Sequence, residues 1–459
     1  MKVYRYTHKI VLLLLICFTA SCKDADAPLS EEQEEETEFE GETAFIKTYG
    51  GSNLDEAVSI VLADDGNYII LGSTKSTDGD IVDKTESDFD YWLLKVTPEG
   101  DIIWSKTYGG PSDEVAASLI KTTDGGYIAC GSSRGAGGDV SNNAGFHDFW
   151  IVKFNTEGDL QWEESFGFSG SDKAYSIKQT NDGGYAVVGE LDVTASDGDG
   201  GLGSKTSEIP NRSIQHAGGD YWLLKLSATG QLEWRNYYGG TFTDTAYDIF
   251  QTTDGDYLVF GTSDSFDVDI TNNIGTYDFW VVKVSETGTI IWEKNYGGTQ
   301  IENLYAASQT SDGNYLMFGD TRSSDVDVTS DFGNADIWGA KIDKDGNLIS
   351  QQSYGGSQFE SAQDITRFSN GTYVITGNVR SNDGDFTENN GQNDALAMVV
   401  DEAGALQFQL TIGGSNFDFS RDAVEAENNK IVIVGSTQSN DKDIPQNRGV
   451  EDVLLFKIK

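Results

Sequence analysis

The sequence predicts an all-β fold, a seven-bladed β-propeller of four-stranded blades in which the N-terminal strand completes the last blade. The first observation is a Tyr-Gly-Gly motif, or a close variant, at seven places: 49–51, 108–110, 166–168, 238–240, 296–298, 354–356 and 412–414. The second is the spacing of these motifs, 59, 58, 72, 58, 58 and 58 residues, which is typical of a structural repeat. Four-stranded units repeated in this way form a ring-shaped propeller.

Each repeat contains four short runs with strand character. In the first complete repeat they are 56–61, 68–72, 91–96 and 102–108, all rich in β-branched, aromatic and other apolar residues. An Asp-Gly pair separates the first run from the second, and a Glu-Gly pair separates the third from the fourth. Because glycine tolerates the positive φ of a tight hairpin, both connections are expected to be short turns.

The two ends of the repeat array predict how the ring closes. Residues 453–459 match a third strand, and no fourth strand follows them. Residues 45–49 match the missing fourth strand and precede the first complete repeat. We therefore expect the N-terminal strand to join the last blade, which removes the open sheet edges of an unclosed ring.

The N-terminus carries a targeting signal. Three basic residues precede an apolar run at 10–18, and the sequence Thr-Ala-Ser-Cys follows at 19–22. This arrangement resembles a bacterial lipoprotein signal peptide, which implies removal of residues 1–21 and lipidation of Cys22. An ordinary secretory signal and a retained membrane anchor are the alternatives, although the apolar run is short for a spanning helix.

Residues 22–43 are expected to form a disordered tether, since the acidic stretch 31–42 cannot bury a core. An acidic tract behind the lipidated cysteine resembles the export signal of surface lipoproteins of Bacteroidota. The DGG-Tyr and Tyr-Gly-Gly repeats of the predicted propeller, 44–459, are similar to those of propeller lipoproteins from the same group. The resemblance implies a protein anchored by lipid to the outer membrane at the cell surface, with the periplasmic leaflet as the alternative.

Charge and cysteine content limit the partners and the cross-links. The formal net charge is −44, and loss of residues 1–21 removes three basic side chains, so the mature charge is 28 minus 75, or −47. Nucleic acid is therefore not expected as a partner. With Cys22 lipidated, Cys130 is the other mature cysteine, so no disulfide framework is expected and Cys130 should be a buried apolar residue.

Residues that recur in every repeat are expected to serve the scaffold. Two carboxylate positions recur seven times, and a third-strand lysine and tryptophan recur in most repeats. We expect hydrogen bonds and ion pairs from the charged positions and packing between blades from the tryptophans. A ring of carboxylates at the channel mouth is the functional alternative. Aromatic residues outside the repeat pattern, Phe146, Phe266 and Phe332, are candidates for ligand contact.

Paired aspartates recur in the connections between the second and third strands, on the face opposite the tight hairpins. Carboxylates two residues apart suit a hard cation such as Ca²⁺, although aspartate beside glycine is also ordinary turn chemistry. Calcium is thus a possible cofactor and solvated turns are the alternative. The candidate ligands are Asp78, Asp80, Asp267, Asp269, Asp325, Asp327, Asp383, Asp385, Asp441 and Asp443.

One connection, at 192–219, is longer than its counterparts by 72 minus 58, or 14 residues. It contains Lys205, Arg212 and His216, which form a candidate site for an anionic group or an acidic glycan, and His147 occupies the equivalent loop of the preceding repeat. A tolerated surface insertion is the alternative.

The sequence favours a binding or interaction role over catalysis. It lacks a nucleophile elbow, a phosphate-binding glycine loop with lysine, and a clustered Cys/His metal set. We expect a non-catalytic envelope propeller that binds a glycan or a partner protein, without a specified oligomeric state. A polysaccharide hydrolase or lyase and a structural or adhesion component are the alternatives.

Overall fold

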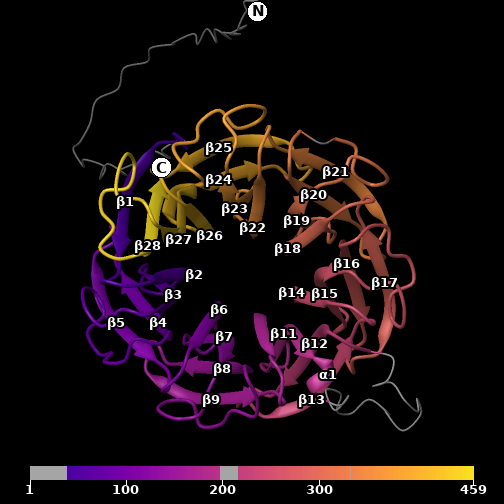
Figure 1. Cartoon of the computed structure of the whole chain (residues 1–459), viewed down its shortest axis with the longest axis horizontal. Helices are drawn as coiled ribbons and strands as arrows, with labels where there is room; N and C mark the ends of the chain where they lie inside the picture. Colours follow the sequence, from indigo (N-terminus) through magenta and orange to yellow (C-terminus); the bar gives the residue numbers. More distant parts are fainter. Residues whose placement is uncertain (1–38, 197–215, 331) are drawn as a thin grey trace, which may run out of the picture. The chain divides into compact units, whose positions relative to one another are not determined.

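The computed structural model describes residues 39–196, 216–330 and 332–459, which form the predicted seven-bladed β-propeller (Figure 1). Seven antiparallel sheets of four strands surround a central channel, with the first strand of each complete repeat innermost. The first four blades are β2 (Asp55–Leu62), β3 (Tyr68–Thr74), β4 (Asp90–Val96) and β5 (Ile102–Tyr108); β6 (Glu114–Lys121), β7 (Tyr127–Ser133), β8 (Asp148–Phe154) and β9 (Leu160–Phe166); β10 (Lys173–Gln179), β11 (Tyr185–Asp192), β12 (Gly219–Leu226) and β13 (Leu232–Tyr238); and β14 (Asp244–Gln251), β15 (Tyr257–Ser263), β16 (Asp278–Val284) and β17 (Ile290–Tyr296).

The remaining blades follow the same order. They are β18 (Glu302–Gln309), β19 (Tyr315–Thr321), β20 (Asp336–Ile342) and β21 (Leu348–Tyr354); β22 (Glu360–Arg367), β23 (Tyr373–Val379), β24 (Asp394–Val400) and β25 (Leu406–Ile412); and β26 (Asp418–Glu425), β27 (Ile431–Thr437), β28 (Asp452–Ile458) and β1 (Thr43–Tyr49). A short helix, α1 (Val193–Ser196), follows β11, and a 3-10 turn, η2 (Glu427–Asn429), precedes β27. No helix in the described ranges is long and apolar enough to cross a membrane.

The N-terminal strand closes the ring, as the sequence predicts. β1 pairs antiparallel with β28, and Tyr49 lies opposite Val453. The backbone N–H groups of Glu40 and Gly41 also donate to the carbonyl oxygen of Lys459, at 3.0 and 2.7 Å. The compact unit therefore begins at Phe39, ahead of the boundary at residue 44 that composition indicated.

Aromatic side chains of the third strands pack between neighbouring blades. Trp150 and Trp280 are fully buried, and their ring centroids lie 4.5 Å from those of Tyr91 and Tyr221 in the preceding blades. The indole N–H of Trp280 donates to Glu293 Oε2 on the fourth strand, at 3.0 Å. The prediction that the recurring tryptophans pack between blades is confirmed.

Cys130 is also fully buried, and burial raises the pKa of its thiol.

In the five blades whose motif has tyrosine, the tyrosine hydroxyl joins the outer strand to the next blade. The hydroxyl of Tyr49 donates to the Gly100 carbonyl at 2.7 Å, and that of Tyr296 donates to the Gly346 carbonyl at 2.6 Å. These acceptors belong to the hairpin between the third and fourth strands of the following blade. The bond explains why tyrosine recurs at this position.

The recurring carboxylates also serve the scaffold. Asp244 is fully buried and accepts hydrogen bonds from the Gly240 N–H at 2.7 Å and the Ser265 hydroxyl at 2.9 Å. Asp278, on the third strand, accepts from the Ile274 N–H at 2.6 Å, and burial raises its pKa to about 7. These carboxylates fix the loops internally and do not form a solvent-facing ring at the channel mouth.

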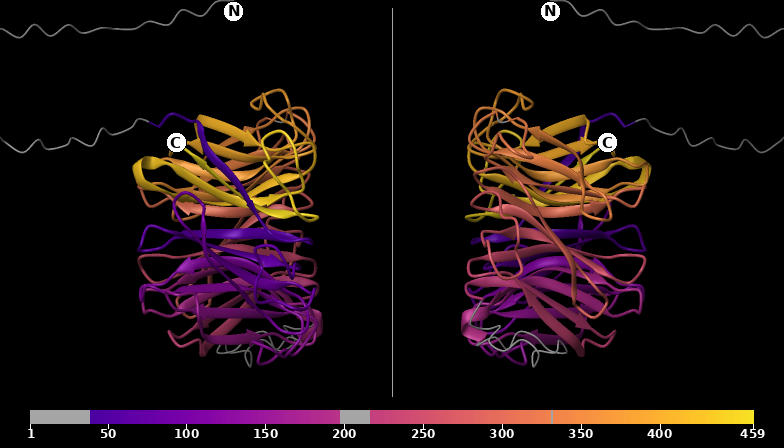
Figure 2. Two further views of the ribbon diagram at one scale, coloured as in Figure 1. Left: turned by 90° about the vertical axis from the view of Figure 1, so that its left-hand side faces the viewer. Right: turned by 90° about the vertical axis from the view of Figure 1, so that its right-hand side faces the viewer.

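The third-strand lysines pair with the aspartates of the tight hairpins, as Lys153 does with Asp124 at 3.0 Å. The strands cross the thickness of the ring, as the side views of Figure 2 show. The connections between second and third strands meet the Tyr-Gly-Gly turns on one side, which we call the loop face. The contact between the Ser52 N–H and Asp78 Oδ1, at 2.7 Å, is an example. The opposite side is the hairpin face.

Candidate functional site

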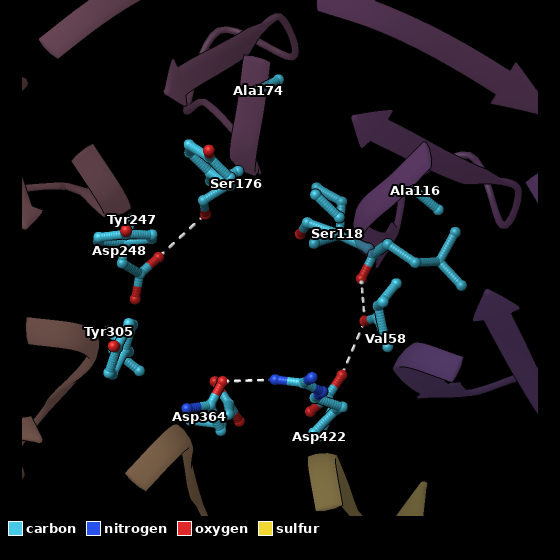
Figure 3. A pocket seen from close by; sticks show the side chains of 18 of the residues that line it. Val58, Ala116, Ser118, Ala174, Ser176, Tyr247, Asp248, Tyr305, Asp364 and Asp422 are labelled. Carbon is cyan, nitrogen blue, oxygen red and sulfur yellow. Dashed lines mark hydrogen bonds between the residues drawn. The ribbon is translucent and has the colours of Figure 1, made fainter. Parts of the chain in front are cut away.

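The innermost strands enclose a cavity of about 740 Å³, which we call the channel cavity (Figure 3). This volume lies within the range of roughly 300–1,000 Å³ that is usual for small-ligand sites. The lining comes from all seven blades, so the cavity is walled on every side by β-strands. Lining side chains come from different blades, and their chemistry differs around the ring.

A β-bulge in every innermost strand sets the register of this lining. In each strand the pairing with the second strand of the blade skips one residue. In β14, for example, Ala246 and Asp248 pair with consecutive residues of β15, and Tyr247 between them is unpaired. A bulge re-aims a side chain and bends its strand. The seven bulged residues all line the channel cavity: Val58, Ala117, Tyr175, Tyr247, Tyr305, Gln363 and Arg421.

Three consecutive blades carry tyrosine at the bulge, and we call these residues the tyrosine arc. The ring centroids of Tyr175 and Tyr247 lie 5.1 Å apart, and those of Tyr247 and Tyr305 lie 5.3 Å apart. Each ring is partly accessible. Burial and nearby carboxylates, first among them Glu190, raise the pKa of Tyr247 to about 12, so its hydroxyl is protonated at neutral pH. Figure 3 shows Tyr247 and Tyr305 across the lumen from Val58 and Ser118.

Arg421 and Gln363 continue the ring of bulged residues. Arg421 Nη1 donates to Gln363 Oε1 at 2.6 Å, and the guanidinium lies 5.4 Å from the Phe419 ring centroid. Burial raises the pKa of the nearby Glu56, and the positive charge of Arg421 opposes that rise. A guanidinium has five N–H donors, so Arg421 retains donors for a ligand in the cavity.

The residues that follow the bulge place charges in the lumen. Asp248, Asp364 and Asp422 come from three blades, and Lys178 Nζ lies 3.2 Å from Asp248 Oδ1. Burial lowers the pKa of Lys178, but Asp248 and the other two carboxylates outweigh it and the pKa is raised. Burial and the charge of Asp422 raise the pKa of Asp364 well above its usual range.

Two of these carboxylates also join neighbouring blades. Asp248 accepts from the Ala307 N–H at 3.3 Å, and Asp422 accepts from the Ile60 N–H at 2.9 Å. Asp364 instead accepts from the Thr366 hydroxyl of its own strand, at 3.1 Å. In the described part of the chain Asp364 forms no bond to a neighbouring blade. Of these three aspartates, Asp364 therefore contributes least to holding neighbouring blades together.

The lining of the channel cavity is balanced in charge, although the protein as a whole is strongly acidic. Four lining residues are acidic and four are basic: Glu56, Asp248, Asp364 and Asp422, and Lys173, Lys178, Arg367 and Arg421. The chain as a whole carries a formal charge of −44. The cavity thus has many hydrogen-bonding groups and no formal net charge.

The structure separates the two predicted histidines. His147 lines the channel cavity, and its Nδ1 lies 3.0 Å from Ser171 Oγ. Burial, with Lys173 and Arg134, lowers the pKa of His147, so it is neutral at physiological pH. His216 is only 3% exposed and its Nδ1 lies 2.5 Å from Asp220 Oδ2, and its role in ligand binding stays a prediction. Lys205, Arg212 and Cys22 lie outside the described residues.

The paired aspartates accept hydrogen bonds within the loop face. Asp325 Oδ1 accepts from the Thr299 N–H at 2.8 Å, and Asp327 Oδ2 accepts from the Gly297 N–H at 3.3 Å. The same bonds recur for Asp78 and Asp80, Asp267 and Asp269, Asp383 and Asp385, and Asp441 and Asp443. Across 39–196, 216–330 and 332–459, no group of three or more His, Cys, Asp or Glu side chains could hold a metal ion. Calcium binding stays a prediction.

Sequence reasoning did not select the channel cavity. A signal was present in the repeats, because the bulged position varies from alanine and valine to tyrosine, glutamine and arginine, whereas the residue before it is alanine in five of the seven repeats. The alternation of side chains along a strand does not by itself show which of them face the channel, because the bulge inserts one residue into that alternation. The loop aromatics Phe146, Phe266 and Phe332 are exposed, and none of them lines the cavity.

Comparison with known proteins finds similar structures only at low sequence identity. No model of a known protein family matches this chain, and no curated protein matches it. Among solved structures, it is similar to the WD40 β-propeller domain of Doa1, with 12% identity and a TM-score of 0.47 over 89% of this chain and 95% of that one. It is also similar to a catalytically inactive virginiamycin B lyase from Staphylococcus aureus, with 9% identity and a TM-score of 0.47 over 90% and 99% of the two chains. It is also similar to the Pan2 WD40 domain of Neurospora crassa, with 9% identity and a TM-score of 0.46 over 87% of this chain and 88% of that one. The chain is a repeat-type seven-bladed β-propeller.

Proposed function

We propose that this chain is a lipid-anchored envelope protein of the outer membrane whose propeller binds a neutral glycan in the channel cavity. The observation that carries the glycan proposal is the tyrosine arc, which three successive bulges aim into a lumen that also presents charged and amide side chains. The lipoprotein-like N-terminus supports the anchor and the envelope location.

The chemistry of the lining suits a sugar. The C–H face of a pyranose ring packs against an aromatic ring, and Tyr247 and its neighbours offer such a surface. Carboxylate, amide and guanidinium groups bind hydroxyl groups directionally, and Asp364, Gln363 and Arg421 supply them. Because acidic and basic residues are equal in number in the lining, a neutral ligand does not have to supply a compensating charge.

Glycan hydrolysis is the second candidate function, and Asp364 is the observation that favours it. Its carboxyl group lines the lumen, and its raised pKa is what a general acid needs at neutral pH. Product analysis of any bound oligosaccharide by mass spectrometry tests this candidate. Loss of hydrolysis in Asp364→Asn with binding retained would establish it.

Calorimetric titration with a panel of neutral oligosaccharides tests the binding proposal. Tyr247→Val and Tyr175→Ala place at the bulge the side chains that Val58 and Ala117 already have in other blades, so the fold should accept them. We expect roughly a two- to tenfold loss of affinity in either variant, since an aromatic contact contributes about 0.5–1.5 kcal/mol beyond its buried area and 1.4 kcal/mol is about tenfold. The exposed Phe266→Ala is the matched control and should bind normally. Equal weakening by all three substitutions, or binding by none of the panel, would refute a channel site.

Cys22→Ser tests the anchor. The variant should lose metabolic labelling with a fatty acid and move from the membrane fraction to the soluble fraction. Protease treatment of intact cells then distinguishes the cell surface from the periplasmic leaflet. Unchanged membrane association in Cys22→Ser would contradict lipidation at this residue.

A further inference from the structure

The channel cavity is accessible only along the axis of the ring. Its wall consists of the seven innermost strands, and both neighbours of each strand in the ring are other innermost strands. β2 of the first blade packs against β26 of the last, so the described wall has no lateral opening where the ring closes. A polymer therefore cannot lie across the site as it would in an open cleft.

The tyrosine arc lies well inside this wall. Tyr247 is three residues along β14 from Asp244, whose carboxylate is held at the loop face by the Gly240 N–H. At about 3.3 Å of rise per residue, the arc is roughly 10 Å below the level of that turn. An internal unit of a long chain would have to bend sharply into the channel and out again through the same opening to reach the arc.

An ion pair lies on the hairpin-face side of the tyrosine arc. Lys178 is three residues beyond Tyr175 on β10, and its ammonium reaches Asp248 in the next blade. The same ammonium lies 5.3 Å from the ring centroid of Phe250. This ion pair and the ring lie between the tyrosine arc and the hairpin face. At the opposite end, Val115, Ser132 and His147 line the cavity together with Glu56 and Lys173.

From this geometry we infer that the channel cavity recognises the end of a saccharide chain, which enters from the loop face and places its terminal rings against the tyrosine arc. The inference rests on the proposed glycan function and specifies which part of the glycan is bound. Lys178 and Asp364 then meet the hydroxyl groups of the terminal unit, and Arg421 and Gln363 meet those of the unit at the tyrosine arc. Internal units remain outside the ring.

Chain-end recognition predicts a stoichiometry that does not depend on which sugar is bound. Soluble neutral polysaccharides with unbranched chains, namely amylose and mixed-linkage β-glucan, are each divided into fractions of decreasing mean length by partial acid hydrolysis. Calorimetry with the full propeller then measures binding sites per gram of sugar in each fraction. A tenfold shorter mean length should give about tenfold more sites per gram at an unchanged Kd, because each chain offers one recognised end.

The outcomes separate the inference from the function on which it rests. Sites per gram that stay constant as chains shorten would show recognition of internal units, which overturns the inference and leaves glycan binding intact. Failure of every polymer and hydrolysate to bind overturns both. The end-dependent signal should disappear in Tyr305→Val and persist in Phe266→Ala. Persistence in Tyr305→Val as well would place the recognised end outside the channel and overturn the inference.

Discussion

Val326 has a backbone conformation that valine strongly disfavours. Its φ is 56°, and its side chain is exposed, at 62%. The equivalent loop position is glycine in other blades, where Gly79 and Gly384 have φ of 70° and 68°. A Cβ added to Gly384 would lie 2.2 Å from the carbonyl oxygen of Gly355, so the position is crowded as well as left-handed. We expect Val326→Gly to stabilise the propeller.

The size of the effect follows from two opposing terms. The left-handed conformation costs an L-residue about 1–2 kcal/mol, and glycine removes this cost. Glycine also increases the entropy of the unfolded chain, which costs about 0.4–1 kcal/mol. Since the exposed Val326 side chain loses little burial, the net gain in the free energy of unfolding should be about 1 kcal/mol.

Urea denaturation followed by tryptophan fluorescence measures this gain. The matched control is Val82→Gly, because Val82 is also exposed, at 77%, and does not have a positive φ. The control should lose about 0.4–1 kcal/mol for the entropic reason alone. If Val326→Gly destabilises the protein as much as Val82→Gly does, the loop is not strained and the reasoning fails.

Three further predictions concern closure, pH and metal. Deletion of 39–49 should leave the β28 edge unpaired, and the protein should then aggregate, as measured by size-exclusion chromatography. Deletion of 23–38 is the control and should leave a folded monomeric propeller. A soluble protein that unfolds cooperatively after the first deletion would contradict closure by β1. Burial raises the pKa of Asp278 and Asp394 to about 7, so the folded state holds protons that the unfolded chain releases above pH 4. The melting temperature should therefore rise as the pH falls from 8 to about 5, and Asp278→Asn should reduce this slope; a slope of the opposite sign would refute the assignment. Calcium at millimolar concentration should raise the melting temperature no more than magnesium does, because the loop carboxylates already accept hydrogen bonds from backbone N–H groups. A saturable rise that is specific to calcium would show bound ions.

The sequence predicted much of the scaffold because each blade repeats the same local rules. Alternating apolar residues set the strands, Asp-Gly pairs set the hairpins, and the unpaired third-strand pattern at 453–459 predicted the role of β1. Recurrence also identified the buried tryptophans and the paired lysines as scaffold. These features depend on near neighbours in the chain, so a single sequence contains them.

The candidate site was not predictable in the same way. The insertion at 192–219 stands out in the sequence by its length and composition. The sequence did not show that His216 is buried, because its contact with Asp220 forms in the folded blade. The tyrosine arc depends on a bulge that inserts one residue into the pairing of each innermost strand and thereby changes which side chain faces the channel. Asp248 and Lys178 come from different blades and meet only when those two blades pack together.

The sequence by itself thus determined the number of blades, their strands and the mode of closure, because local patterning and repetition specify them. Tertiary structure alone decided which side chains share the channel, since residues dozens of positions apart converge there only when the innermost strands form a ring. It also set the charge balance of the cavity, because burial and the pairing of Lys178 with Asp248 follow from that convergence.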